Sequence, residues 1–577
     1  MTRNRWFESI LWSLSVAALA LFVPLSPLQA ANLDAKLKAK ADGPPEMVDV
    51  IVQTPGRPSD NDHGHVRAYG GNTGANFTAV NGFPARVPAA ALKGLSNSAR
   101  FSNLSFDAPM KSFYDHNPAG TAIGVAEAFQ TYGATGAKID VAIVDSGAIE
   151  HSDLSYTANT TAIRTFSDYV DGGSSPIDPY GHGSHVAGLI AGGGQVVPGF
   201  AGVAPGAHLH IIRVLDETGA GTVSDVLRAL DWIFSREGKI QVVNLSLGHP
   251  VYESYTTDPL CLAIKALAEI GVVVVVSAGN YGRLDDGTAV YASVTSPGHT
   301  PYAITVGAMN PKGTADRGDD VMATFSSKGP TAIDGLIKPD LVAPGVFMVS
   351  LDSPGSYMDT NYGDLEVSSR LYDAPPGAQD YFLLSGTSMS APIVTGIVAL
   401  MLEQNPSLTP NLVKAILMYT AEDRGYDVMT QGAGYVNAVG ALEVAGKITD
   451  SPDKTSDAEY WLSEPLSGES TIGGQALFWG GRMLWGDALF WGGFGALSYD
   501  FESMWDQAVF WGNLTAFSTY DFEALGIESE AVFWNIGNYL TASAVLWPGL
   551  MMQDIVYGEG FTWNGGKGGG GGGGRKK

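Results

Sequence analysis

The stretch Ile139-Asp-Val-Ala-Ile-Val-Asp-Ser-Gly147 decides the fold class of this chain of 577 residues. Its first six residues are mostly apolar and β-branched, which is typical of a strand buried on both faces of a sheet. Similar apolar runs return further along the chain and alternate with helical patterns. The runs are 211–215, 242–247, 272–276 and 303–306, and the helical patterns are 223–235, 259–270, 391–404 and 412–420. This alternation predicts an α/β fold with a mostly parallel sheet and helices on both faces.

The composition excludes several classes of protein. Apolar residues make up 45% of the chain, which is enough to bury a sizeable core and excludes wholesale disorder. The formal net charge of −26 makes nucleic acid a poor partner, because binding it depends on a basic surface that releases counterions. Cys261 is the one cysteine, which excludes an intrachain disulfide and a cysteine-based zinc site. Since Cys261 falls in an apolar helical pattern, we interpret it as a core residue and not as a catalytic thiol.

Residues 1–31 have the features of a secretory signal peptide. Arg3 and Arg5 precede an apolar run over 10–23, and Ala30 and Ala31 offer small residues for cleavage. The run is short for a membrane span, and an uncleaved anchor is the alternative interpretation. No later stretch is long and apolar enough to cross a bilayer, so we expect no stable membrane span. The sequence therefore predicts a secreted, extracellular protein, with the periplasm or the cell surface as other destinations.

The rest of the chain divides into parts of different texture. Residues 32–115 read as a small α+β unit, whose apolar residues over 48–52 alternate as in a strand. Residues 116–447 hold the α/β pattern. Residues 448–470 are rich in Ser, Asp, Glu and Pro and are interpreted as a linker. Residues 565–577 form a flexible Gly/Lys tail.

Residues 471–564 form a Trp-rich repeat region. A six-residue motif ending in Phe-Trp-Gly or Phe-Trp-Asn occurs over 475–480, 487–492, 507–512 and 530–535. Repetition with β-forming residues and Gly stops predicts a β-rich region. Exposed aromatic residues of this kind can stack on sugar rings or anchor a protein to a surface. We favour the other interpretation, in which each Phe-Trp pair is the core of a small β unit that stacks on its neighbours.

Four polar residues follow strand ends or open helices within the α/β pattern. Asp145 ends the strand quoted above, and Asn280 lies just beyond the apolar run over 272–276. His182 lies between two glycines before a helical pattern. Ser388 lies near a helix N-terminus, where backbone N–H groups and the helix dipole favour an oxyanion. Since sites in open parallel sheets form at the carboxyl ends of strands, these residues can supply an orienting acid, an oxyanion donor, a base and a nucleophile.

Each of these residues also has a simpler interpretation. Taken singly, Asp145 suits a turn and Ser388 suits a helix N-cap. His182 and His185 are spaced at i and i+3, as two metal ligands would be, but no third ligand is arranged nearby. We interpret His185 and His151 as structural residues, and we assign no metal ligands.

The four motifs together resemble the signatures of the subtilisin-like serine proteases. They are Asp145-Ser-Gly, His182-Gly-Ser-His-Val-Ala-Gly, Ala278-Gly-Asn280 and Gly386-Thr-Ser-Met-Ser-Ala-Pro392, in that family's chain order. The likeness covers about residues 117–447 and implies a subtilisin-like fold. It also implies that Ser388 is the nucleophile, that His182 transfers its proton and that Asp145 holds the imidazole. The Asn280 side chain and the Ser388 backbone N–H would bind the oxyanion.

The resemblance also implies how protein or peptide substrates are held. Ser246-Leu247-Gly248 resembles one substrate-binding edge, and Gly219-Ala-Gly221-Thr222 resembles the opposing edge. A substrate peptide would lie between them as an added strand. Ala278 and Gly279 would form pocket walls next to Asn280.

Residues 32–115 resemble the family's inhibitory pro-segment. This implies a zymogen that carries its own intramolecular inhibitor and cuts itself between about residues 106 and 121. Members of the family commonly hold calcium, so calcium is implied as a cofactor. The loop over 192–199 lacks the acidic and amide-rich ligands that calcium requires, and its ligands stay unassigned. Residues 350–380 look like an acidic, Tyr-rich insertion that reshapes the cleft.

The leading hypothesis is a secreted serine endopeptidase that hydrolyses peptide bonds through an acyl-enzyme and is made as a self-processing zymogen. One alternative is a self-processing precursor whose only substrate is itself. The other is a surface-binding protein on a protease scaffold, in which the Trp-rich repeat region carries the main role.

Overall fold

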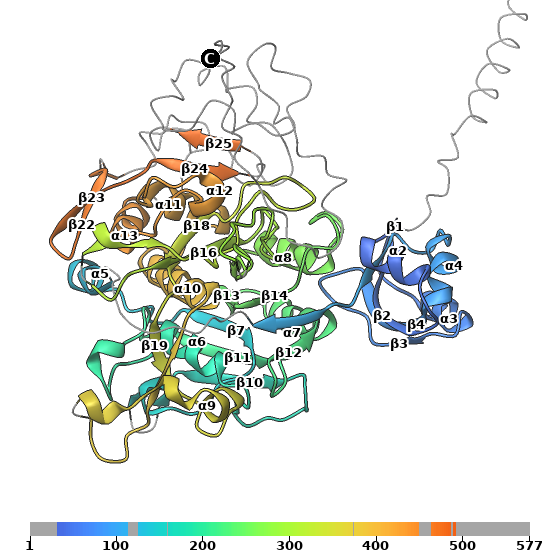
Figure 1. Ribbon diagram of the computed structural model, residues 1–577, viewed down its shortest axis with the longest axis horizontal. Helices are drawn as coiled ribbons and strands as arrows, with labels where there is room; N and C mark the ends of the chain where they lie inside the picture. Colours follow the sequence, from blue (N-terminus) through green and yellow to red (C-terminus); the bar gives the residue numbers. More distant parts are fainter. Residues whose placement is uncertain are drawn as a thin grey trace, which may run out of the picture. The chain divides into compact units, whose positions relative to one another are not determined.

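The structure is a computed structural model that describes most of residues 32–491. The described residues are 32–112, 125–157, 160–284, 286–314, 316–372, 374–448, 463–464, 466–485 and 488–491. The predicted signal peptide, most of the predicted linker, the third and fourth Trp motifs and the predicted tail lie outside them. The chain divides into two compact units: one extends to Asn76 and resumes over Asn81–Phe106, and the other holds Phe77–Val80 and the chain from Asp107 onward (Figure 1).

The smaller unit is a five-stranded sheet with short helices. Its strands are β1 (Asn32–Leu33), β2 (Met47–Gln53), β3 (Asn72–Thr73), β4 (Gly82–Pro88) and β5 (Asn103–Phe106), in the order β1-β5-β2-β4-β3. Its helices are α2 (Ala35–Ala41), α3 (Asp60–Ala68) and α4 (Leu92–Ser96). The alternation of Val48, Val50 and Val52 puts all three in one core with Leu92 and Leu95, as period-two burial requires. Residues 32–41, which carry no strong pattern in the sequence, add a strand and a helix to this unit.

The larger unit is built around an eight-stranded sheet. Its strands are β7 (Asp140–Asp145), β10 (Ile163–Asp168), β11 (His208–Arg213), β13 (Val242–Leu245), β15 (Val273–Ser277), β16 (Ile304–Asn310), β17 (Val321–Met322) and β18 (Leu341–Pro344). The order is β10-β11-β7-β13-β15-β16-β17, with β18 also paired to β16. Every pairing is parallel except that of β17. The predicted parallel sheet is confirmed.

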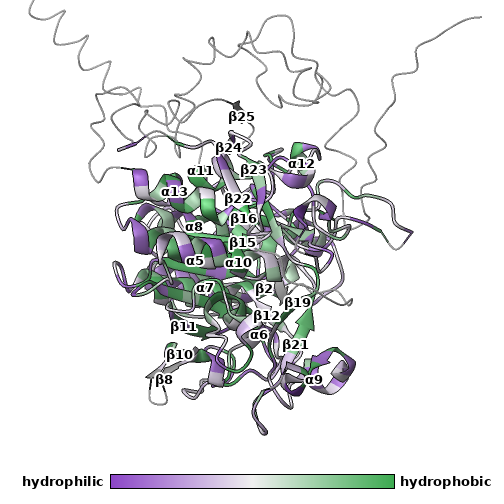
Figure 2. Cartoon of the chain, turned by 90° about the vertical axis from the view of Figure 1, so that its left-hand side faces the viewer, coloured by the Kyte–Doolittle hydropathy of each residue, from purple (hydrophilic) through white to green (hydrophobic). Residues whose placement is uncertain are grey.

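Helices cover the sheet and bury its strands. They include α5 (Val125–Tyr132), α6 (His182–Ala191), α7 (Val223–Phe234), α8 (Pro259–Glu269), α10 (Thr387–Gln404), α11 (Pro410–Thr420) and α13 (Ala438–Lys447). Val141 and Ile143 of β7 join the core that α6 and α10 complete, whereas Ala142 and Val144, which alternate with them, are buried outside that core. Alternate residues of one strand therefore pack on opposite faces. Figure 2 shows hydrophobic colour gathered on the strands and on α10.

The helix that carries Ser388 begins earlier than its apolar pattern indicates. It starts at Thr387, so Pro392 lies beyond the first turn, inside the helix. A proline there has no N–H for the carbonyl four residues earlier, which is the carbonyl of Ser388. The Ser246 hydroxyl donates to that carbonyl instead, at 2.9 Å. The position of Pro392 inside the helix therefore leads to a cross-link between Ser388 and Ser246.

The first Trp motifs form two hairpins, β22 (Glu469–Ile472) with β23 (Gln475–Phe478) and β24 (Arg482–Trp485) with β25 (Ala488–Trp491). Trp479 packs against the larger unit's core, and its ring N–H donates to Ser470 at 2.9 Å. Phe478 is 70% exposed. In this first motif the Phe-Trp pair is thus split between core and solvent. Across the described residues, no helix has the length and apolar character needed to cross a bilayer.

The predicted insertion over 350–380 packs beside the start of α6. It contains the end of β19 (Met348–Leu351), α9 (Tyr357–Asn361) and β20 (Glu366–Val367), and β21 (Tyr381–Leu384) follows it. Tyr357 donates its backbone N–H to Pro179 at 2.8 Å, and its ring stacks on Tyr180 with centroids 5.9 Å apart. The insertion therefore contacts the residues that precede His182.

Asp352, at the base of this insertion, makes the stability of the larger unit depend on pH. Burial, together with the carboxylates of Asp359, Glu366 and Asp380, raises the pKa of Asp352 from 3.8 to about 7. The folded chain then holds a proton that the unfolded chain has released, so stability falls as the pH rises from about 4 through about 7.

Asp352→Asn removes this ionisation. We expect the variant to be more stable than the parent above pH 7 by about 2–4 kcal/mol, with no gain near pH 4. Melting curves at several pH values, recorded in Ser388→Ala chains to prevent self-digestion, measure the difference. Asp364→Asn, at an exposed position of the same segment, is the control. A gain independent of pH would contradict the assignment.

Candidate active site

Asp145 and His182 form the first contact of the site. Asp145 is the last residue of β7, and His182 is the first residue of α6. Both side chains are fully buried, and Nδ1 of His182 lies 2.8 Å from Oδ1 of Asp145. The remaining ring nitrogen, Nε2, is buried and finds no hydrogen-bond partner within the described residues. The imidazole is therefore held at one nitrogen and has the other available.

Asp178, a residue that the motif analysis missed, holds the start of α6. One of its oxygens accepts from the Gly181 N–H and from the Ser146 hydroxyl, each at 2.8 Å, and the other accepts from the Ser184 N–H at 2.7 Å. These bonds satisfy N–H groups that a helix N-terminus leaves unpaired. The Ser146 hydroxyl in turn accepts from the Gly183 N–H at 2.9 Å. An Asp three residues before a Gly-His helix start is the signal that was available in the sequence.

Ser388 lies in the first turn of α10 and is tied to Ser246. Its hydroxyl donates to the Ser246 carbonyl at 3.1 Å, and the Ser246 hydroxyl donates to the Ser388 carbonyl. Asn244 donates to the Ser246 hydroxyl at 2.9 Å and accepts from Thr395 at 2.9 Å. This buried polar chain fixes the serine against the end of β13. Helices α6 and α10 pack on each other, which brings the elements of His182 and Ser388 together.

Asn280 is oriented by Thr387, the neighbour of Ser388. The Asn280 side-chain oxygen accepts from both the backbone N–H and the hydroxyl of Thr387, each at 3.0 Å. Because that oxygen faces two donors, the amide nitrogen faces the other way. The nitrogen is buried and has no hydrogen-bond partner in the described part of the chain. Asn280 therefore presents a preoriented donor next to the serine helix.

A segment of the chain itself lies between the two predicted substrate edges. The strand β6 (Pro109–Ser112) pairs antiparallel with β12 (Ala220–Thr222) on one side and with β14 (Leu247–Gly248) on the other. Gly219, with a φ of 75°, leads into β12. A side chain there would meet the Tyr180 ring at 2.5 Å. Ser246 directly precedes β14.

Ala278 and Gly279 lie at the end of β15, next to the Ser388 helix. The Gly279 N–H donates to the Thr387 hydroxyl at 3.1 Å. Gly279 has a φ of 102°, and a side chain there would press on Thr295 and Ser327. The Ala278 carbonyl accepts from the Thr295 N–H at 3.1 Å. The predicted pocket wall at Ala278 and Gly279 is therefore supported by the loop that contains Thr295.

The other candidate side chains are structural within their surroundings. His185 is fully buried, and its Nε2 donates to the carbonyls of Met348 and Phe382. Burial lowers its pKa to about 3. His151 accepts from the Asp153 N–H through Nδ1 at 3.1 Å, which caps a short turn. Burial raises the pKa of the Cys261 thiol well above its usual value, which does not suit a nucleophile.

The loop over 192–199 does not suit calcium. Asp153, a carboxylate that contacts this loop, accepts from the Val196 N–H at 2.8 Å with one oxygen and from the Tyr381 hydroxyl with the other. The Gln195 side chain donates to the Ser155 carbonyl. One carboxylate and one amide are fewer side-chain oxygen ligands than calcium usually takes. The Asp153 carboxylate is bound by hydrogen-bond donors of the protein, and we therefore assign no calcium ligands in this loop.

Comparisons with known proteins identify the family of the chain. The subtilase family model matches residues 136–436. The chain is 38% identical to serine protease AprX of Bacillus subtilis over 375 residues, which covers 63% of this chain and 79% of that protein. It is 32% identical to the extracellular serine proteinase of a Thermus species over 350 residues, covering 59% of this chain and 71% of that protein.

A solved structure shares the fold. The structure of fervidolysin from Fervidobacterium pennivorans, a keratinolytic enzyme related to subtilisin, superposes with a TM-score of 0.54 at 24% identity. The match covers 72% of this chain and 63% of the fervidolysin chain. At this low sequence identity, the match supports a shared fold and nothing further. With the family model spanning more than half of the sequence, the chain belongs to the subtilase family and is a serine endopeptidase.

Proposed function

We propose that the protein is a secreted endopeptidase made as a self-processing zymogen, with Ser388 as nucleophile, His182 as general base and Asp145 as the group that orients it. The buried Asp145 carboxylate accepts from Nδ1–H of His182, which leaves Nε2 as the basic nitrogen. As the Ser388 oxygen attacks the peptide carbonyl, its proton passes to Nε2. The same proton then goes to the leaving amine, and a water molecule hydrolyses the acyl-enzyme by the same route.

The negative oxygen of the tetrahedral intermediate needs hydrogen-bond donors. The Asn280 amide nitrogen is the side-chain donor whose orientation supports this role, because Thr387 occupies the oxygen of the same amide. The backbone N–H of Ser388 is the second donor, at a helix N-terminus whose dipole favours negative charge. Donors that are already oriented cost no reorganisation when charge develops.

The observation that carries the proposal is the position of β6. A strand that enters between β12 and β14 adopts the arrangement by which a peptide substrate adds to a sheet edge. Just before it, the Asp107 carboxylate accepts from the Ser224 N–H at 2.9 Å, and the Ala108 carbonyl accepts from the Val223 N–H at 3.1 Å. These contacts hold the chain at the start of α7. Residues 107–112 therefore have the contacts expected of the last part of an intramolecular inhibitor.

The register of β6 identifies the bond that we expect to be cut. Lys111 lies opposite Gly248, and Ser112 lies opposite Leu247. Ser246 directly precedes β14, and its carbonyl accepts from the Ser388 hydroxyl. The last described residue of β6, Ser112, is therefore paired next to the residue that contacts the proposed nucleophile. On this ground we propose the bond after the next residue, Phe113–Tyr114, as the processing bond.

Secretion rests on the sequence of residues 1–31 and on the relatives. One similar protein is named an extracellular serine proteinase. The intact mass of the protein recovered from the culture medium measures whether residues 1–31 are removed and whether the Trp-rich repeat region stays attached.

Self-processing has a defined outcome. We expect the parent chain to gain a new N-terminus at Tyr114 and the Ser388→Ala chain to stay uncut there, because the nucleophile is absent. N-terminal sequencing and intact mass measure both. Phe113→Asp places a charge next to the scissile bond and is expected to slow the cut at least about tenfold. The neighbouring Tyr114→Ala is expected to leave the cut at the same bond. An identical cut in Ser388→Ala would show that another protease makes it.

Thr387 positions the oxyanion donor. Thr387→Val keeps the shape but removes the hydroxyl that Asn280 and Gly279 contact, and we expect kcat on casein peptides to fall about 10–100-fold with little change in KM. Thr387→Ser is expected to restore it. Asn280→Ala is expected to cost about 10²–10³ in kcat, the range known for this donor in subtilisins. An unchanged kcat in both variants would contradict the oxyanion assignment.

The same assays separate the alternatives. A precursor that cuts only itself would process normally and leave casein intact. A surface-binding protein would keep its activity in Ser388→Ala. Hydrolysis of casein by the processed parent, and its loss in Ser388→Ala, supports the endopeptidase.

A further inference from the structure

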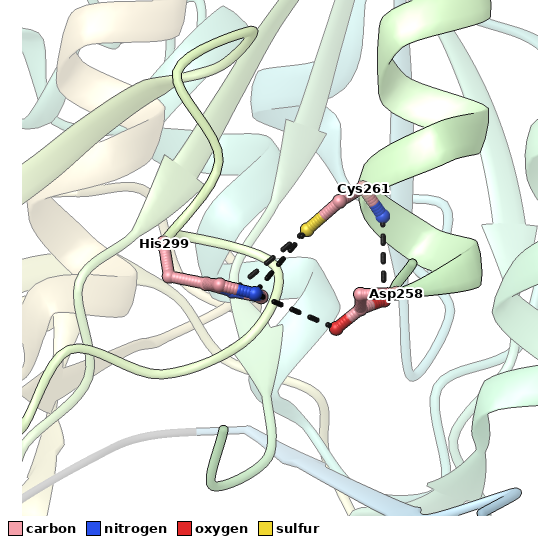
Figure 3. A group of neighbouring side chains, drawn as sticks. All are labelled: Asp258, Cys261 and His299. Atoms are coloured by element: carbon pink, nitrogen blue, oxygen red, sulfur yellow. Dashed lines mark hydrogen bonds and ion pairs between the residues drawn. The ribbon is translucent and has the colours of Figure 1, made fainter. Parts of the chain in front are cut away.

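Three potential metal ligands meet in the larger unit, outside the site described above. Asp258 caps the N-terminus of α8, Cys261 lies in the first turn of that helix, and His299 lies in the loop before β16. Their exposed fractions are 2%, 0% and 0%. Figure 3 shows the three side chains pointing toward one another across the space between helix and loop.

The spacing of their donor atoms suits a single small metal ion. The Cys261 sulfur lies 3.7 and 3.8 Å from the two ring nitrogens of His299. Nε2 of His299 lies 3.8 Å from Oδ2 of Asp258. Ligands about 2.0–2.3 Å from a tetrahedral zinc ion lie roughly 3.5 Å apart. Over the described residues, this is the one group of three such side chains whose donor atoms all lie within 4.8 Å of one another.

The contacts of His299 are the second observation. Its imidazole is fully buried, yet the only hydrogen-bond partner that the described residues give its nitrogens is the sulfur. Buried imidazoles ordinarily bond to oxygen or nitrogen at shorter range. The ring is aimed at the gap between the sulfur and the carboxylate. An ion in that gap would replace these long contacts to the sulfur and to Asp258 with metal–ligand bonds.

Asp258 is held as a metal ligand usually is. Its Oδ1 accepts from the backbone N–H groups of Leu260 and Cys261, at 2.8 and 3.3 Å. Its Oδ2 accepts from the Ser296 hydroxyl at 2.7 Å. Hydrogen bonds of this kind orient a ligating carboxylate and leave a lone pair for the ion.

We propose that Asp258, Cys261 and His299 bind a zinc ion. A thiolate and a carboxylate balance the two positive charges of the ion, so the loaded site is neutral and suits a buried position. Sulfur and imidazole select zinc over calcium or magnesium, which take oxygen ligands. A water molecule or a nearby protein oxygen completes the coordination. The exclusion of a cysteine-based zinc site from the cysteine count is therefore revised, since His299 joins Cys261 from 38 residues away.

The ion would fasten two segments that support the substrate cleft. The loop that carries His299 also contains Ser296, which exchanges two backbone hydrogen bonds with His249, at 3.0 and 2.8 Å. His249 directly follows β14, one of the substrate edges. Thr295 of the same loop bonds to Ala278. The zinc ion would link α8 to the loop that supports the segments of His249 and Ala278. Such a structural site does not depend on the proposed catalytic roles.

Cobalt reports on this site without any substitution at it. The full-length Ser388→Ala chain, without a histidine tag, is unfolded in chelator and refolded with cobalt(II). Because Cys261 is the only cysteine, a thiolate-to-cobalt charge-transfer band can arise from this site alone. We expect the band at one cobalt per chain and its loss when zinc is added. A refolded chain with native melting behaviour and no such band overturns the proposal.

Two variants and a matched control complete the test. Cys261→Ala and His299→Gln are expected to weaken zinc binding at least about 100-fold, measured by equilibrium dialysis with elemental analysis. His151→Gln, at a buried histidine outside both sites, is expected to bind like the parent. Zinc binding of equal strength and stoichiometry in folded Cys261→Ala would mean adventitious binding only and would overturn the proposal. Since every chain carries Ser388→Ala, the result is independent of proteolytic activity.

Discussion

The hydrogen bond between Asp145 and His182 depends on burying a carboxylate at the end of a strand. Removing such a charge from water costs several kcal/mol unless donors compensate it. Here one oxygen accepts from His182 and, at 2.7 Å, from the Ser146 N–H. Ser146 and Asp178 then hold the first turn of α6, so the backbone that carries the imidazole is fixed relative to Asp145. The parallel pairing of β7 with β11 and β13 keeps the strand end in place.

Ser388 is also positioned by buried hydrogen bonds. Pro392 has no N–H to donate to the Ser388 carbonyl, and the Ser246 hydroxyl donates to that carbonyl instead. Ser246 is itself held by Asn244, and Asn244 by Thr395 of the serine helix. This closed chain of buried bonds joins α10 to β13, and cooperative networks of this kind specify one geometry. The proposed substrate edge at Ser246–Gly248 and the proposed nucleophile, Ser388, thus share one support, so the distance between them does not depend on a flexible loop.

Much of the fold could be predicted, and the candidate site residues could be selected, because both depend on local patterns. β-branched runs predict buried parallel strands, and polar residues directly after those runs fall at the edge where sites form. What the sequence could not show depends on contacts between distant segments. Thr387 looks like a helix cap until its hydroxyl is seen on Asn280, and Asp178 looks like a loop residue until it is seen to bind three groups. His299 has no pattern of its own, since its relation to Cys261 exists only after α8 and its neighbouring loop have packed.

In the proposed zymogen, the position of β6 lets one chain carry both a protease and its inhibitor. Before cleavage the strand belongs to the same molecule, so its effective concentration at the cleft is high and free substrate cannot compete. The strand has no free end until the bond that follows it is cut. Among the described residues, three sets of contacts would join the two pieces after the proposed cleavage. They are the pairing of β6, the contacts of Asp107 and Ala108 with α7, and the N–H groups of Thr78 and Ala79 that donate to Asp231, each at 2.7 Å. Loss of these contacts by dissociation, or by digestion of the released piece, would make the proposed activation irreversible without any change in the proposed catalytic residues.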